Sequence, residues 1–376
     1  MTKKILLNIK EINNKISDLQ RDINELLEIS KIKNTNKITE KISDLENYKN
    51  PKKYNLLGNY TIKTKTCPQV YYSFCAFNSI NNIIYLIYIV NDTSIVFYDL
   101  VDKKKIIEIK NAHKESIYTL KHFLDNINRR DLLLSMSYEK SIANIKIWDI
   151  NKFECIFYYN NKEVYKQLDA CLLNHITGNY VVITNECGEI LVYNFNRFLV
   201  KKIESNERNY FVYPYYDNIE IESYIIIGSE YSVSSYYFDS NLLYHKYKDG
   251  LEVKDLFVNE KKIHNLIMND KQEIKKLIES DSYDIRIWNF HSGILLKKIS
   301  INEINITSIS LWNNDFLFIG SKNKILLINL QYAMVVDELL GHNEVICIQK
   351  IIHPKLGECL ISQGNGNDFI FLRSIE

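Results

Sequence analysis

Apolar and polar residues alternate with a period of two over short stretches along most of this chain. In residues 144–150, Asn-Ile-Lys-Ile-Trp-Asp-Ile, the alternation places Ile145 and Ile147 on one face of an extended segment and Lys146 and Trp148 on the other. Short polar turns separate stretches of this kind. The pattern predicts β-strands joined by tight turns.

One phrase within this pattern recurs. Residues 284–290, Asp-Ile-Arg-Ile-Trp-Asn-Phe, repeat the pattern of residues 144–150, with the same residue at three of the seven positions and a residue of similar character at the others. Weaker copies precede, separate and follow the two. Aligned on the tryptophan, the copies carry the following residues at the shared position: Tyr98, Trp148, Tyr193, Phe238, Trp288, Ile328 and Leu372. Successive positions differ by 50, 45, 45, 50, 40 and 44 residues.

The spacing of the copies predicts an architecture. Four strands of about 5 to 6 residues with turns of 2 to 5 use roughly 40 residues, so each copy is expected to be one four-stranded sheet. Such sheets bury both faces when they stack around an axis. We therefore expect an all-β fold, a seven-bladed β-propeller over residues 51–376. The last copy leaves no room for a fourth strand, and residues 53–64 are expected to complete that sheet and close the ring.

Two dipeptide motifs carry a family resemblance. Trp148 is followed by Asp149, and a histidine comes after a small residue at Ala112-His113 and Gly341-His342. The chain over residues 52 to 376 resembles the WD-repeat β-propeller family. The resemblance implies a hydrogen-bonded chain in each blade, from the histidine through a Ser or Thr of the second strand to the tryptophan, with an Asp in the following turn. No obvious turn Asp lies between His113 and Trp148, so we expect that chain to be broken there.

Residues 1–50 have a different period. Apolar residues at alternating spacings of four and three form a heptad seam, made of Ile5, Ile9, Ile12, Ile16, Leu19, Ile23 and Leu26. The seam predicts an N-terminal α-helical, coiled-coil-like segment over about residues 3–30, with a second short helix near residues 37–47. An isolated apolar stripe needs a partner: another chain, including a second copy, or the propeller itself, and fraying is the remaining outcome. A helix before a ring is similar to the layout of G-protein β subunits, whose helix coils with a γ subunit.

Charge and composition exclude some classes. Of 376 residues, 47 are Lys or Arg and 46 are Asp or Glu, so the net charge of +1 gives no field that would attract nucleic acid. The longest apolar run, residues 83–90, is far shorter than the roughly 20 residues of a membrane helix. Seven scattered cysteines without metal-ligand spacing and the lack of a signal peptide pattern predict a cytoplasmic protein, with the nucleus as an alternative.

Catalytic patterns are missing from the sequence. It contains no nucleophile elbow, phosphate-binding loop, dinucleotide fingerprint or metal-ligand spacing, so we expect no enzyme, no cofactor and no metal. The candidate partner-binding residues are the seam positions Ile9, Ile12, Ile16, Leu19, Ile23 and Leu26, together with Tyr213, Tyr215, Tyr216 and Trp312 on the ring. Packing between blades is the alternative for the tyrosines.

The sequence thus predicts a non-catalytic scaffold that binds partner proteins through its N-terminal helix and one propeller face. The alternatives are a non-catalytic subunit of an enzyme complex, for example an RNA-modifying one, and a G-protein-β-like signalling subunit. The sequence does not choose the face or the partner.

Overall fold

The computed structural model describes residues 54–60, 74–139, 142–160, 167–205, 207–229, 232–247, 265–269, 275–281, 283–301, 305–340, 345–364 and 370–375. All of them belong to the unit Tyr54–Glu376. The predicted N-terminal helix and its seam, from Ile9 to Leu26, lie outside the described residues. Among the described residues, no helix has the length and apolar character to cross a membrane.

The described strands form seven four-stranded antiparallel sheets, and six of these sheets use four strands that are consecutive in the chain. The first four sheets comprise β2 (Phe74–Asn78), β3 (Ile84–Val90), β4 (Ser94–Asp99) and β5 (Lys104–Ile109); β6 (Ile117–Asp125), β7 (Arg130–Glu139), β8 (Ile142–Asp149) and β9 (Glu154–Asn160); β10 (Gln167–His175), β11 (Gly178–Asn185), β12 (Glu189–Asn194) and β13 (Leu199–Glu204); β14 (Asn209–Asp217), β15 (Glu222–Ser229), β16 (Val233–Tyr237) and β17 (Leu243–Tyr247).

The remaining three sheets complete the set. They comprise β18 (Asn265–Asn269), β19 (Lys276–Ser280), β20 (Asp284–Asn289) and β21 (Leu295–Ser300); β22 (Ser308–Leu311), β23 (Phe316–Gly320), β24 (Lys324–Asn329) and β25 (Met334–Leu340); and β26 (Val345–His353), β27 (Gly357–Gly364), β28 (Ile370–Ile375) and β1 (Tyr54–Tyr60).

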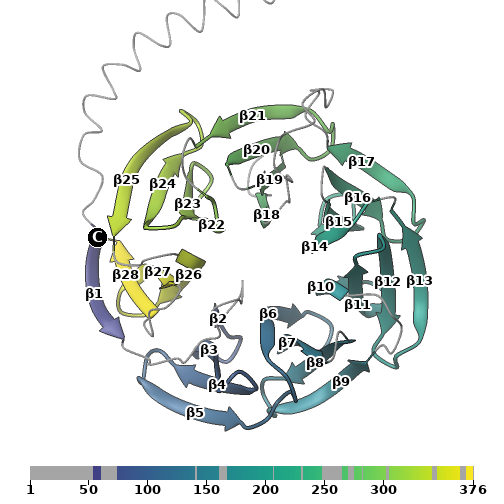
Figure 1. Cartoon of the computed structure of the whole chain (residues 1–376), viewed down its shortest axis with the longest axis horizontal. Coiled ribbons are helices and arrows are strands. Elements are labelled where there is room, and N and C mark those ends of the chain that lie inside the picture. The colour runs from purple at the N-terminus through teal and green to yellow at the C-terminus, as the bar shows by residue number, and fades with distance from the viewer. Residues whose placement is uncertain are drawn as a thin grey trace, which may run out of the picture. The chain divides into compact units, whose positions relative to one another are not determined.

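These sheets stand around a central axis (Figure 1). The first strand of each sheet contacts the first strand of the next, and β26 of the last sheet contacts β2 of the first, so the ring is closed. The predicted all-β propeller is confirmed. Each residue that aligned with Trp148 in the sequence lies in the third strand of its sheet, except Phe238, which directly follows β16.

Burial follows position within a sheet. The six residues from Ile84 to Ile89 in β3 are all buried, because both faces of a middle strand pack against neighbouring sheets. In β21, at the rim, exposed and partly buried residues alternate over most of the strand. The apolar clusters lie between consecutive sheets; one of them joins Phe97 of β4 to Leu133 and Trp148 of the next sheet. Stacking of sheets therefore supplies the core, as the repeat pattern predicts.

A hydrogen-bonded chain crosses the sheet β6–β9. The ring nitrogen Nε2 of His113 lies 2.7 Å from Ser135 Oγ, and Trp148 Nε1 donates to the same oxygen at 2.8 Å. Ser137 Oγ lies 2.7 Å from His113 Nδ1. Our expectation of a broken chain here was wrong, because Ser137 supplies a hydrogen-bonding group to the histidine without a turn Asp. Burial, assisted by Lys146, lowers the pKa of His113 to about 3, so its ring is neutral.

The sheet β18–β21 has different residues at the positions that form these hydrogen bonds in the sheet β6–β9. Trp148 pairs with Leu133, and Trp288 pairs with Leu277, so Glu279 stands where the other sheet has Ser135. Arg286, which pairs with Glu279, stands where the other sheet has Lys146. A buried ion pair thus replaces the serine-centred hydrogen bonds.

Strand β1 lies within the range 53–64 and joins the two ends of the ring. It pairs antiparallel with β28, from Tyr54 opposite Ile375 to Tyr60 opposite Ile370, with an irregularity between Leu56 and Gly58. Its main-chain groups therefore satisfy those of β28, which would otherwise form an open edge.

This pairing gives a testable difference between two truncations. Removing residues 1–50 is expected to leave a cooperative thermal unfolding transition, because β1 is retained. Removing residues 1–65 is expected to lower the melting temperature and cause concentration-dependent aggregation, because the edge of β28 is then exposed. Calorimetry and light scattering on both proteins measure this; equal behaviour of the two would contradict closure by β1.

Candidate interaction face

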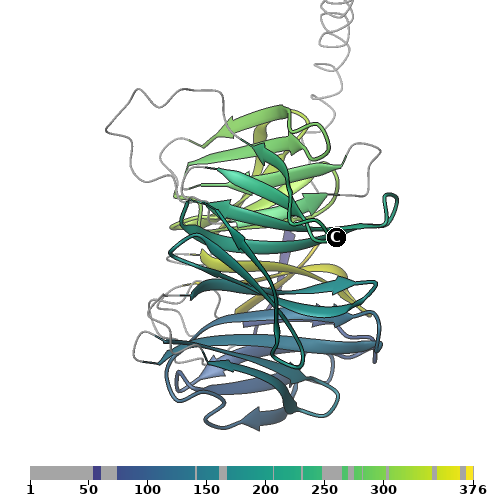
Figure 2. The same cartoon turned by 90° about the vertical axis from the view of Figure 1, so that its right-hand side faces the viewer.

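The turns of the ring emerge on two opposite faces, as the side view shows (Figure 2). In the six sheets made of consecutive strands, the connection between the first and second strands and the turn between the third and fourth strands lie at the same edge; in the last sheet this edge holds the turn between β26 and β27. These edges meet across neighbouring sheets, where Asn81 Nδ2 donates to Asn151 Oδ1 at 2.8 Å and His175 Nε2 lies 3.4 Å from Asp239 Oδ2. We call the face that carries these turns face A, and the opposite face, face B.

Neighbouring sheets are linked at face A by a recurrent contact. Lys201, His245 and Lys297 occupy the same register position in the fourth strands of three consecutive sheets. Each donates a hydrogen bond to a main-chain carbonyl that follows the third strand of the next sheet, at 3.0, 2.5 and 3.1 Å respectively. These contacts fix the turns of face A relative to one another.

Exposed isoleucines project from face A near the axis. They belong to the first strand, or the turn that follows it, in five consecutive sheets of the ring. We take one residue from each of the five sheets and call this set the isoleucine arc: Ile352, Ile80, Ile127, Ile176 and Ile219. Their exposed fractions run from 42% to 80%, whereas an isoleucine in a stable fold is usually buried.

A second group of exposed apolar side chains lies further from the axis. It occupies the third–fourth turns, and the starts of the fourth strands, of four consecutive sheets: Phe198, Leu199, Val200, Leu242, Leu243, Ile294, Leu296, Tyr332, Met334 and Val335. Among the described residues, only Tyr283 and Leu340 of the exposed large apolar side chains lie at face B. An apolar bias this one-sided is typical of a surface that binds another molecule.

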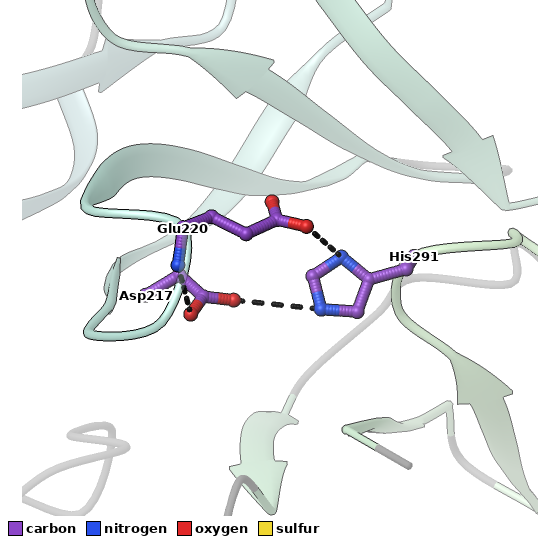
Figure 3. A group of neighbouring side chains, drawn as sticks. All are labelled: Asp217, Glu220 and His291. Atoms are coloured by element: carbon purple, nitrogen blue, oxygen red, sulfur yellow. Dashed lines mark hydrogen bonds and ion pairs between the residues drawn. The ribbon is translucent and has the colours of Figure 1, made fainter. Parts of the chain in front are cut away.

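A polar cluster lies on face A where the sheets β14–β17 and β18–β21 meet (Figure 3). Asp217 ends β14, Glu220 lies in the turn that follows, and His291 follows β20. Asp217 Oδ2 is 3.4 Å from His291 Nε2, and Glu220 Oε1 is 3.8 Å from His291 Nδ1. Asp217 is buried, His291 is partly exposed and Glu220 is exposed.

The two oxygens of Asp217 have different surroundings. Oδ1 accepts hydrogen bonds from the main-chain N–H groups of Ile219 at 2.8 Å and Glu220 at 3.2 Å, and it pairs with the ammonium of Lys275. Oδ2 has no hydrogen-bond partner among the described residues. Burial alone would raise the pKa of Asp217, but the hydrogen bonds and the Lys275 charge outweigh it and lower the pKa. The carboxyl group is therefore ionised at neutral pH.

Two tyrosines hold the rest of the cluster. Tyr224 Oη donates to Glu220 Oε2 at 2.9 Å, and Tyr244 Oη lies 3.1 Å from His291 Nδ1. Burial, with Glu220 next, raises the pKa of Tyr224, which keeps its hydroxyl protonated.

The ring residues singled out in the sequence lie mainly between sheets. Tyr215 is 6% exposed and packs on Tyr224 and Phe290, while Tyr213 and Tyr216 are partly buried. Trp312, at 8% exposed, packs edge-on against Phe318. The structure places Tyr215 and Trp312 in the core rather than on a surface, because the first strand of each sheet packs against its neighbour.

Sequence reasoning missed the isoleucine arc. An isoleucine beside a strand end usually continues the buried pattern, so Ile176 and Ile219 did not stand out. The available signal was a single isoleucine inside a polar turn, as in His-Ile-Thr-Gly at 175–178 and Asp-Asn-Ile-Glu at 217–220.

Comparisons with known proteins identify the fold. No family model and no curated protein matches this chain. A crystal structure of BBS1N in complex with ARL6DN, soaked with lead, matches with a TM-score of 0.64 and 11% identity, over 87% of this chain and 98% of that chain. The same complex soaked with mercury matches with a TM-score of 0.64, 9% identity and the same coverage. At these identities the likeness shows a β-propeller, and a shared fold does not assign a function.

Proposed function

We propose that this protein is a non-catalytic scaffold, a seven-bladed propeller of WD-repeat type that binds partner proteins through face A. The observation that carries the proposal is the isoleucine arc, in which five consecutive sheets each expose an isoleucine on the same face. Binding would remove these side chains from water, at about 25 cal/mol for each Å² of apolar surface buried.

The surroundings of the arc support a protein partner. Polar, mostly uncharged turn residues such as Asn81, Asn128 and Thr177 lie beside the isoleucines, and an apolar centre with a polar rim is the usual composition of a protein interface. The similar structure BBS1N is itself a propeller in complex with a protein, ARL6DN.

The proposal extends to the N-terminal segment. We assign the heptad seam of residues 5–26 to assembly with another helix, because its Ile and Leu positions need burial. Strand β1 begins at Tyr54 opposite Ile375, the last residue of a third strand, so the Tyr54 end of β1 lies at face A. We place the protein in the cytoplasm on the basis of its scattered cysteines.

Two substitutions on the arc test the function. Ile176→Lys and Ile219→Lys together put two charges at the most exposed arc positions, where a partner would have to desolvate them. Tagged protein is purified from its native cells, and the amounts of co-eluting proteins are compared. We expect at least one stoichiometric partner to be reduced about tenfold or more, since tenfold corresponds to about 1.4 kcal/mol and loss of a central interface contact costs about 2 kcal/mol or more.

Leu340→Lys is the matched control, because Leu340 is 74% exposed but lies at face B. It should retain the partner, and both proteins should melt like the wild type, since surface changes usually stay within about 0.5 kcal/mol. Equal retention by both proteins, or a partner reduced only by Leu340→Lys, would refute binding through face A.

A further inference from the structure

We propose that Asp217, Glu220 and His291 bind one divalent transition-metal ion, Zn²⁺, at face A between the sheets β14–β17 and β18–β21. The three residues come from two sheets, and one ligand atom from each lies within 4.8 Å of the others. Two carboxylates and one imidazole form a donor set that zinc accepts.

The central distance fits two ligands of one ion better than a hydrogen bond. Asp217 Oδ2 and His291 Nε2 are 3.4 Å apart, beyond the usual 2.7–3.2 Å of an N–H···O bond. Zinc bonds of about 2.0–2.2 Å to oxygen and nitrogen, arranged tetrahedrally, place two ligand atoms roughly 3.3–3.5 Å apart. The pair is therefore already spaced for a shared ion.

The buried carboxylate supplies the second observation. Asp217 is 0% exposed, and its Oδ2 has no hydrogen-bond partner among the described residues. A buried anionic oxygen that accepts no hydrogen bond is costly. Because Lys275 and two main-chain N–H groups already satisfy Oδ1, a cation on the His291 side would complete the group.

The neighbouring tyrosines orient the other two ligands. If the Nδ1–H group of His291 donates to Tyr244 Oη, at 3.1 Å, the Nε2 lone pair points toward Asp217. Ligating histidines usually make such a bond through their other nitrogen. Tyr224 holds one oxygen of Glu220 and leaves Oε1 facing the cluster (Figure 3). Three protein ligands leave one position for water.

A related pair elsewhere on face A lacks these features. His175 and Asp239 also join two neighbouring sheets at 3.4 Å, but Asp239 is 63% exposed and no third ligand among the described residues is grouped with them. We expect that pair to bind no ion, so it provides a matched control.

The test uses the full chain after treatment with a chelator, with Cys67, Cys155 and Cys187 replaced by serine. Cys155 and Cys187 are exposed thiols, a ligand type that zinc accepts, so they would compete with the proposed site. Cys67 lies outside the described residues. Calorimetric titration with Zn²⁺ should show one equivalent per chain. Co²⁺ should give the visible spectrum of a tetrahedral nitrogen–oxygen site without thiolate charge transfer.

Variants assign the binding to these residues. His291→Ala and Asp217→Asn should abolish the equivalent, Tyr244→Phe should weaken it about 10–100-fold, and His175→Ala should leave it unchanged. Circular dichroism is used to check that each variant is folded. If His291→Ala is not folded, His291→Gln is tested in its place. An absent equivalent in the parent, or an unchanged one in folded His291 variants, would overturn the site. Neither result bears on partner binding through the isoleucine arc.

Discussion

Replacing Trp288 by alanine is expected to lower the free energy of unfolding of the ring by about 3–5 kcal/mol. Trp288 is 2% exposed and lies in a cluster with Leu277, Tyr247 and Phe290 that joins two sheets. The ring of Tyr247 meets it edge-on at 5.8 Å between centroids. Because the surrounding strands belong to two hydrogen-bonded sheets, they cannot collapse into the cavity, and the loss should approach the upper end of the range.

Urea unfolding followed by circular dichroism measures this effect. Trp148→Ala, at 6% exposed, should cost a similar amount and should also leave Ser135 without the indole donor. Tyr332→Ala is the control, because Tyr332 is exposed and should change stability by less than about 0.5 kcal/mol. A loss below about 1 kcal/mol for Trp288→Ala would mean that the indole does not join the two sheets.

At alkaline pH, Arg286→Met is expected to lower the free energy of unfolding by about as much as Trp288→Ala. The guanidinium lies 3.2 Å from Glu279, 2.9 Å from Asp281 and 3.2 Å from Asp284, and Arg286, Glu279 and Asp281 are all buried. Removing one partner of a buried ion pair leaves an uncompensated charge and costs about 3–5 kcal/mol. The double variant Arg286→Met/Glu279→Gln should recover much of this loss, because it removes the stranded charge as well.

The pH dependence identifies the stranded charge. Burial raises the pKa of Glu279 to about 7 even with Arg286 beside it, whereas the unfolded chain titrates near 4.5. Between pH 4.5 and 7, Glu279 has already lost its proton in the unfolded chain but still holds it in the folded protein. Its contribution to the free energy of unfolding therefore decreases as pH rises through this range. Without Arg286 the folded pKa should rise further. The loss in Arg286→Met should therefore be larger at pH 8 than at pH 5; a loss independent of pH would exclude Glu279 as its cause.

The propeller could be predicted from the sequence because the alternation of apolar and polar residues within each strand is a local pattern. Period-two alternation and the recurring phrase placed Trp148 and Trp288 in third strands, and the structure has both there. The contact of Ser137 with His113 was not predictable, because Ser137 reaches the histidine only through the register of the sheet. The polar cluster was not predictable either, because Asp217 and His291 are 74 positions apart in the sequence and come together only when two sheets stack.

Exposure was the other quantity that the sequence could not give. Tyr215 and Ile219 are four residues apart, and the aromatic residue looked like the binding residue. In the structure Tyr215 is 6% exposed and Ile219 is 80% exposed, since one lies in a strand against the next sheet and the other in a turn. Packing between sheets, rather than residue type, decides which side chain a partner could reach.

The pairing of β1 with β28 also has a consequence for biosynthesis. Ile370 follows its partner Tyr60 by 310 residues, so β1 leaves the ribosome long before the strand that it must join. At about 5–20 residues per second, the nascent chain waits roughly 15–60 s with β1 unpaired. Over that interval the growing stack has two unprotected ends, which chaperones would have to shield. Messenger damage that removes β28 would release a product whose earlier sheets are complete but in which β1 has no strand to pair with.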